Sequence, residues 1–195
     1  MKSSQNYAEL YQHYEKHKDT IALRLKEFQQ QRSEKEIFQE LCFCLLAANT
    51  SSRMAMRVMD SVGDVIFTGS EEEIRDRLHS LSCRFYNKRA EYIFLARSVP
   101  LKFDRMYLAE NIKGFGYKES SHFLRNIGHS GYAILDKHVL RAMLEFGVIK
   151  KIPAMHAKNY LLLEKKLENF SKKLGIRMDE LDFVLWSRKG GEILK

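Results

Sequence analysis

Apolar residues recur every three or four positions along most of this chain, which is the spacing of one face of an α-helix. Residues 36–48 and 159–174 show this pattern most clearly. Strands would show alternating apolar and polar residues, and no stretch keeps that alternation. The pattern therefore predicts an all-α fold. The other predicted helices lie within residues 1–33 (one or two helices) and at residues 54–62, 71–81, 102–111, 118–126, 137–144 and 180–187.

Local signals mark where several of these helices begin and end. Ser70, followed by Glu73, forms a capping box ahead of an apolar run. Asp136 and Asp179 precede two later helices, as N-capping residues do. Gly128 follows an apolar stripe and is a typical helix stop.

The candidate chemistry lies in residues 111–141, which read NIKGFGYKESSHFLRNIGHSGYAILDKHVLR. Gly114 and Gly116 can adopt positive φ and leave no side chain between the backbone and a ligand. Amides of such a turn, beside a helix N-terminus, suit a phosphate. Lys118 lies in the first helical turn, where the helix dipole and any burial favour the neutral, nucleophilic amine. Asp136 could orient that amine or stabilise a cation formed during reaction.

Each of these features also has an ordinary structural explanation. Glycine turns between helices are common, and a lysine near a helix start is usually a solvated charge. An aspartate before an apolar stripe is usually only an N-cap. The functional interpretation therefore depends on the order and spacing of these residues.

That order and spacing resemble a known family. Residues 112–118 are similar to the hairpin of the helix-hairpin-helix DNA glycosylases, which include endonuclease III and the 8-oxoguanine DNA glycosylases. Residues 134–140 resemble the family's next segment, which has a catalytic aspartate and a histidine two residues later. The resemblance covers roughly residues 35–195. It implies a helix-hairpin-helix motif at about residues 104–127.

Within this family, a lysine in the hairpin is typical of enzymes that combine N-glycosylase and β-lyase activity. The resemblance implies that Lys118 is the nucleophile and Asp136 the second catalytic residue. It also implies that Gly114, Gly116 and His138 hold the DNA backbone. The run GYKESSHFLRN and the ending GGEILK look most like the compact type-2 8-oxoguanine DNA glycosylases of archaea and some thermophilic bacteria.

Two C-terminal residues are candidates for recognising the extruded base. Trp186 resembles the family's stacking platform, and the α-carboxylate of Lys195 resembles the group thought to bind the guanine Watson–Crick edge. The structural alternatives are a core tryptophan and a frayed chain end.

Asn49 follows the helix predicted at residues 36–48 and matches the family's amide side chain that fills the duplex gap left by the extruded base. The alternative is that Asn49 simply caps a helix end.

Aromatic and basic residues are interleaved in residues 83–93. Arg84, Lys88 and Arg89 suit phosphates, and the ring of Phe85 can wedge or stack against bases. The alternative is the start of a basic helix with Phe85 in the core.

The family's fold implies a single unit of two helical lobes. We expect residues 35–100 to form one lobe, and residues 1–34 with 101–195 to form the other.

Composition narrows the partners and the compartment. The 33 basic and 25 acidic residues give a net charge of +8, which favours a polyanionic partner. Three cysteines exclude a cluster held by four cysteines within the chain, which endonuclease III relatives often carry. No stretch approaches the roughly 20 apolar residues of a spanning helix, and the N-terminus lacks a secretory h-region. We expect a monomer in a prokaryotic cytoplasm, associated with the nucleoid and not with a membrane.

The sequence thus predicts a DNA repair enzyme that excises 8-oxoguanine from duplex DNA and cuts the strand through a lysine Schiff base. This chemistry requires no metal or redox cofactor. One alternative is a glycosylase/lyase for another damaged base. The other is a helix-hairpin-helix module that binds DNA without catalysis.

Overall fold

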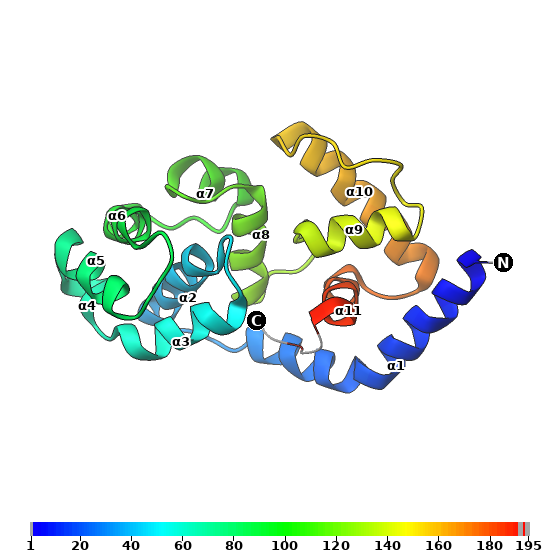
Figure 1. Cartoon of the computed structure of the whole chain (residues 1–195), viewed down its shortest axis with the longest axis horizontal. Helices are drawn as coiled ribbons and strands as arrows, with labels where there is room; N and C mark the ends of the chain where they lie inside the picture. The colour runs from blue at the N-terminus through cyan, green and yellow to red at the C-terminus, as the bar shows by residue number, and fades with distance from the viewer. Residues whose placement is uncertain (1, 191–192, 194–195) are drawn as a thin grey trace. The chain divides into compact units, whose positions relative to one another are not determined.

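The computed structural model of the chain describes residues 2–190 and 193, and every regular element in this part is a helix (Figure 1). The all-α prediction is confirmed. The helices are α1 (Lys2–Phe28), α2 (Glu34–Ala47), α3 (Ser52–Val62), α4 (Val65–Thr68), α5 (Glu71–Ser80), α6 (Tyr86–Ala96), α7 (Arg105–Asn111), α8 (Tyr117–Asn126), α9 (Lys137–Glu145), α10 (Ala157–Leu174) and α11 (Met178–Gly190). The sequence pattern missed the short α4, and for α6 it offered a helix start only as the alternative to a DNA-contacting turn.

The chain divides into two compact units. Residues 31–127 form the central unit, and residues 1–30 with 128–190 form the terminal unit. The lobes expected from the sequence place residues 101–127 with the C-terminal segment. These residues belong to the central unit because α8 packs on α2, where Asn126 Nδ2 donates to Glu40 Oε1 at 2.7 Å.

The central unit is built around α2. Residues 40–47 of this helix are buried without interruption, so α2 has no solvent face along its second half. Helices α3, α6 and α8 pack against it (Figure 1). A helix that is apolar all round needs such cover on every side, because any uncovered face would expose apolar surface to water.

The terminal unit is built in the same way around α11. Residues 181–185 are all buried, and α1, α9 and α10 pack on this helix. Asp179 was expected to be the N-cap, but α11 begins at Met178, so Asp179 lies in its first turn. Its carboxylate instead accepts the Gly131 N–H at 3.3 Å and ties the loop before α9 to α11.

The predicted helix signals act as expected. Ser70 and Glu73 form a reciprocal capping box at α5, and Asp136 caps α9. Gly128 has φ +94° just past the end of α8. These contacts connect residues within four positions of one another, which is why the sequence reveals them.

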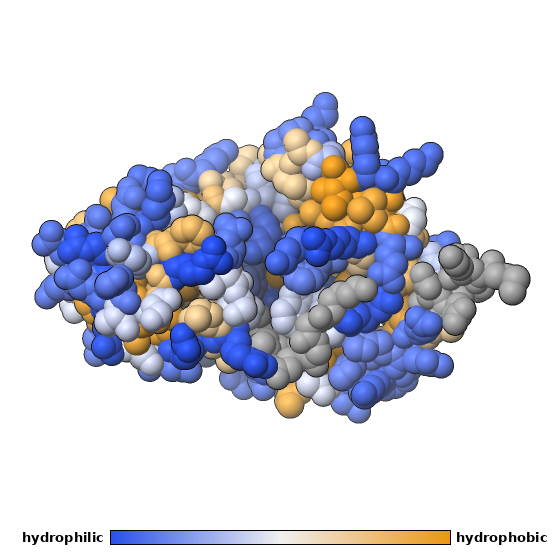
Figure 2. Space-filling model, in the orientation of Figure 1, coloured by the Kyte–Doolittle hydropathy of each residue, from blue (hydrophilic) through white to orange (hydrophobic). Residues whose placement is uncertain are grey.

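The face shown in Figure 2 is mostly polar, and one of its apolar areas lies over α9 and α10 of the terminal unit. The exposed apolar side chains in and around that segment include Met155, Leu161 and Leu162. Within the described residues, none of the helices is long and apolar enough to cross a membrane. Cys42, Cys44 and Cys83 are buried thiols, and burial raises the pKa of the Cys42 thiol.

Candidate active site

The turn between α7 and α8 holds the two hairpin glycines in different conformations. Gly114 has φ +90°, and a Cβ atom there would lie 2.3 Å from the Tyr92 ring. Gly114 is therefore required both for its backbone conformation and for close packing on α6. Gly116 has φ −119°, an extended conformation open to any residue, and is the N-cap position of α8. Phe115, between them, is buried and packs on Phe123 with ring centroids 6.1 Å apart.

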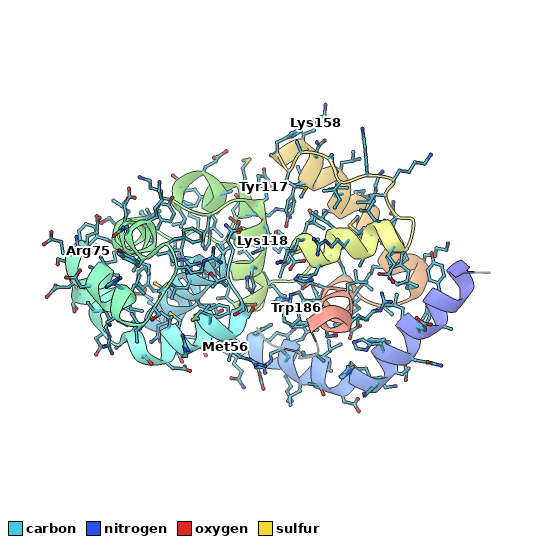
Figure 3. All side chains as sticks on the ribbon, viewed as in Figure 1. Met56, Arg75, Tyr117, Lys118, Lys158 and Trp186 are labelled. Atoms are coloured by element: carbon cyan, nitrogen blue, oxygen red, sulfur yellow. The ribbon has the colours of Figure 1, made fainter. Side chains whose placement is uncertain are left out.

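Lys118 is the second residue of α8 and follows Gly116 of the hairpin by two positions (Figure 3). Its side chain is partly buried, with 27% of its surface exposed. Nζ lies 3.4 Å from Oε1 of Glu119. The other oxygen of that carboxylate, Oε2, accepts the Gly116 N–H at 3.3 Å. Glu119 thus links the hairpin backbone to the candidate nucleophile.

Polar contacts inside the central unit fix the helix that carries Lys118. Arg105 on α7 donates to Ser121 Oγ at 3.4 Å, and its guanidinium lies 5.2 Å from the Tyr117 ring centroid. At the other end of α8, Asn126 accepts from Arg125 Nε at 3.1 Å and donates to Glu40. Buried polar groups satisfied in this way hold a helix in one orientation.

Asp136 lies in the terminal unit, at the start of α9. Its Oδ1 accepts the N–H groups of His138 and Val139, each at 2.8 Å. No described residue donates a hydrogen bond to Oδ2, so this oxygen can face a developing positive charge. Asp136 is thus a helix cap with a second oxygen available for chemistry.

Trp186 lies on α11 in the same unit and is partly exposed (Figure 3). Its ring meets the His138 ring edge-on, with centroids 6.4 Å apart and an interplanar angle of 69°. The next residue, Ser187, has its Oγ 2.8 Å from His13 Nε2 on α1. The indole is therefore supported from α9 while keeping an exposed part. Lys195, the other candidate for base recognition, lies outside the described residues.

Asn49 is exposed and has φ +56° in the loop after α2. The C-cap position of α2 is Ala48, whose N–H donates to Cys44 O, and Asn49 is the next residue. A left-handed glycine or asparagine at this position commonly ends a helix, so Asn49 fits the structural alternative. Its side chain is exposed and is also a candidate DNA contact.

Residues 83–93 combine both interpretations of their sequence. The segment does begin a helix, α6, but Phe85 is 54% exposed and outside the core. Arg84 and Lys88 are exposed, and the Arg84 guanidinium lies 5.0 Å from the Phe85 ring centroid.

Arg89 differs from its prediction as a DNA contact. It is only 4% exposed, and its guanidinium donates to Ala48 O and Cys83 Sγ within the central unit. Its hydrogen bonds are directed into the protein, so it supports the loops around it. Sequence reasoning could not tell this arginine from its exposed neighbours.

Sequence reasoning also missed Glu119. Glu119 lies three residues after the N-cap Gly116, which is the spacing of a capping box. The pattern is normally recognised by a serine or threonine at the N-cap, and here that position is a glycine. Among the described residues, no three His, Cys, Asp or Glu side chains converge as a metal site.

Comparisons with known proteins agree on one family. Residues 21–176 match the Ogg-HhH family, described as 8-oxoguanine DNA glycosylase. The 8-oxoguanine DNA glycosylase/AP lyase of Korarchaeum cryptofilum is 41% identical over 191 residues, covering 91% of each chain. The crystal structure of the Thermotoga maritima 8-oxoguanine DNA glycosylase superposes with a TM-score of 0.92 at 34% identity, covering 99% of this chain and 100% of that one.

A third relative was solved with DNA. The Methanocaldococcus jannaschii 8-oxoguanine glycosylase/lyase, in complex with a 15mer containing 8-oxoguanine, gives a TM-score of 0.85 at 40% identity. The match covers 91% of this chain and 93% of that one.

Proposed function

This chain belongs to the 8-oxoguanine DNA glycosylase family, and we propose that Lys118 and Asp136 carry its two catalytic steps. The enzyme is an 8-oxoguanine DNA glycosylase/AP lyase. It excises 8-oxoguanine from duplex DNA and cuts the strand by β-elimination through a lysine Schiff base. One observation carries the assignment of the nucleophile. Lys118 is a partly buried lysine in the first turn of α8, two residues after the Gly114–Gly116 hairpin.

In the first step the neutral Lys118 amine attacks C1′ of the flipped nucleotide. The bond from C1′ to the base breaks, and the base leaves with the bonding electrons and takes up a proton. The deoxyribose ring then opens to give a Schiff base between Nζ and C1′. In the second step a C2′ proton is removed and the C3′–O bond breaks, so the downstream strand leaves with a 5′ phosphate. Hydrolysis of the remaining unsaturated Schiff base frees Lys118.

Asp136 supports these steps as a fixed negative charge. Two backbone N–H groups hold its Oδ1 and so orient the carboxylate. Its charge stabilises the positive charge that develops on the sugar and on the Schiff base, and it helps to keep the attacking amine reactive. A preoriented charge needs no reorganisation when the reaction occurs.

DNA binding combines phosphate contacts with ring contacts. We assign backbone contacts to the hairpin glycines and His138, and strand contacts to Arg84 and Lys88. The Gly116 N–H is occupied by Glu119, so its contact with a phosphate requires that Glu119 release it. Phosphate contacts by basic side chains make the affinity fall steeply with salt.

The remaining assignments concern the extruded base and the gap that it leaves. Asn49 fills the gap, and the exposed ring of Phe85 stacks or wedges against bases. Trp186 stacks on the extruded base, and Lys195 contributes to recognition of its Watson–Crick edge. We further propose that the enzyme acts as a monomer on the nucleoid of a prokaryotic cell.

Borohydride trapping tests the nucleophile directly. The substrates are a duplex with one 8-oxoguanine and the same duplex with a preformed abasic site. The proteins are the wild type, Lys118→Gln and Lys113→Gln. Lys113 is a matched control because it lies in the same hairpin but pairs with Glu91 at the surface.

We expect covalent adducts on both substrates with wild type and Lys113→Gln, and none with Lys118→Gln, which should still bind the duplex. An adduct with Lys118→Gln would assign the nucleophile to another amine. An adduct only on the abasic duplex, with wild type, would indicate a different damaged base. No adduct on either duplex would indicate binding without catalysis.

A further inference from the structure

Two of the proposed DNA contacts have a left-handed backbone conformation. Among the described residues other than glycine, Asn49, Ser82 and Phe85 have positive φ angles, of 56°, 56° and 58°. Asparagine tolerates this region, but a bulky residue such as phenylalanine disfavours it and keeps it where neighbouring contacts hold it. Asn49 and Phe85 are also exposed, so burial of their own side chains does not explain how they are held.

The Arg89 guanidinium holds the residues on both sides of Asn49. Its Nη2 donates to Ala48 O at 2.6 Å and to Thr50 Oγ1. The Thr50 hydroxyl in turn donates to the backbone of α2, at 3.0 Å from Leu46 O. The loop around Asn49 is therefore fixed from within by one arginine and one hydroxyl.

Arg89 also contacts the segment that presents Phe85. Its backbone N–H donates to Phe85 O at 3.0 Å, and its guanidinium carbon lies 5.8 Å from the Phe85 ring centroid. Its Nη1 donates to Cys83 Sγ at 3.2 Å. The Arg89 side chain on α6 thus joins the segment around Cys83 to the loop after α2, where Thr50 lies 39 positions before Arg89 in the sequence.

We propose that Arg89 is a positioning residue that fixes Asn49 and Phe85 relative to each other for opening the duplex. The inference rests on the proposed DNA contacts of these two residues. With both held in advance, the amide enters the gap and the ring supports the neighbouring bases without a loop rearrangement. The planar guanidinium is required, because a lysine ammonium cannot donate in the fixed fork geometry that reaches all three acceptors.

If Arg89 positions Asn49 and Phe85, its replacement should impair one of the two activities selectively. Excising 8-oxoguanine requires that a stacked base leave the duplex, whereas a preformed abasic site has no base to extrude. Loosening Asn49 and Phe85 should therefore impair 8-oxoguanine excision more than cleavage at an abasic site. A purely structural role would lower both activities together, in proportion to the fraction of folded enzyme.

Arg97 provides a matched control at the end of the same helix. Its guanidinium also donates to three protein groups, the carbonyl oxygens of Val65, Ile66 and Gly69. These contacts hold α4, and Arg97 touches neither Asn49 nor Phe85. Arg97→Lys should lower the midpoint of thermal unfolding as Arg89→Lys does, without changing the preference between the two substrates.

The experiment measures single-turnover rates on both duplexes for wild type, Arg89→Lys and Arg97→Lys, with thermal unfolding of each. We expect Arg89→Lys to reduce 8-oxoguanine excision about tenfold or more relative to abasic-site cleavage, since small misplacements have effects of this order. Thr50→Val should shift the same ratio in the same direction, and Thr50→Ser, which keeps the hydroxyl, should restore it. An unchanged ratio in Arg89→Lys, or an equal shift in Arg97→Lys, would overturn the proposal.

Duplex opening is measured separately in a catalytically inactive background. A 2-aminopurine beside the lesion reports unstacking when Lys118→Gln binds, and adding Arg89→Lys should reduce that fluorescence rise. Asn49→Ala and Phe85→Ala show which assumption is wrong if Arg89→Lys lacks the expected defect. If both excise normally, the contact roles are wrong and the inference falls with them. If both are defective while Arg89→Lys is not, only the role of Arg89 is wrong.

Discussion

The Lys118 Nζ and the Glu119 Oε1 lie 3.4 Å apart, while the second oxygen of the same carboxylate holds the Gly116 N–H. Neighbouring residues on a helix do not normally face each other. The contact forms where the Glu119 carboxylate reaches back to the Gly116 N–H at the start of α8. The carboxylate accepts the hairpin N–H and lies beside the amine that we propose as the nucleophile.

Glu119→Gln separates these two roles. Glutamine keeps an oxygen that accepts the Gly116 N–H but removes the charge beside Lys118. We expect thermal stability to be retained and excision to fall about tenfold or more, because the amine loses a group that orients it and can accept its proton. Single-turnover excision measures the effect. Wild-type rates would restrict Glu119 to capping the helix.

Asp136 can be tested in the same way, since asparagine is also a good N-cap. Asp136→Asn should keep α9 stable and lose most excision activity, because the amide carries no charge. Asp136→Ala should in addition lower the free energy of unfolding by about 1 kcal/mol. Excision rates and urea unfolding curves give the comparison, and near-normal turnover in Asp136→Asn would reduce the residue to a cap.

Gly114 and Gly116 should respond differently to a single methyl group. Gly114→Ala would place Cβ 2.3 Å from the Tyr92 ring at φ +90°, and we expect the free energy of unfolding to fall by about 1–3 kcal/mol. Gly116→Ala has an ordinary φ and its nearest described neighbour at 3.5 Å, so it should change stability little. Urea denaturation of both variants checks this, and equal effects would contradict the packing argument.

Lys195 and Trp186 should affect recognition of the base more than cleavage of the sugar. Removing Lys195 should lower 8-oxoguanine excision more than cleavage at a preformed abasic site. Trp186→Leu should show the same preference, because it removes the stacking surface. Parallel rates on the two substrates measure the ratio, and equal losses on both would argue against base recognition by these residues.

His13 gives the terminal unit a predicted pH dependence. Burial, followed by the charges of His17, Arg188 and Lys16, lowers the pKa of His13 below its usual value. The folded state thus favours neutral His13, while the unfolded chain takes up a proton near pH 6.5. Its contribution to stability is complete above that pH and decreases as pH falls below it.

Urea unfolding at pH 7.5 and pH 5.5, followed by fluorescence of the only tryptophan, tests this. The wild type should lose more stability on acidification than His13→Gln. An equal loss in both proteins would assign the pH dependence to other groups.

The sequence by itself determined the features that depend on neighbours along the chain. Apolar periodicity gave the helices, and short polar residues and glycines marked the starts of α5 and α9 and the end of α8, because helical contacts join residues three or four positions apart. The hairpin spacing from Gly114 to Lys118 is also a local feature of the sequence, and with residues 134–140 it carried the resemblance to the family.

Only the tertiary structure decided which side chains are buried and what they hold. Arg84, Lys88 and Arg89 look alike in sequence, yet only Arg89 is buried, because its acceptors come from a loop about forty residues earlier. The placement of residues 101–127 with α2 likewise depends on the contact between Asn126 and Glu40, which are 86 positions apart. Burial and long-range hydrogen bonds are properties of the folded chain, and local patterns do not encode them.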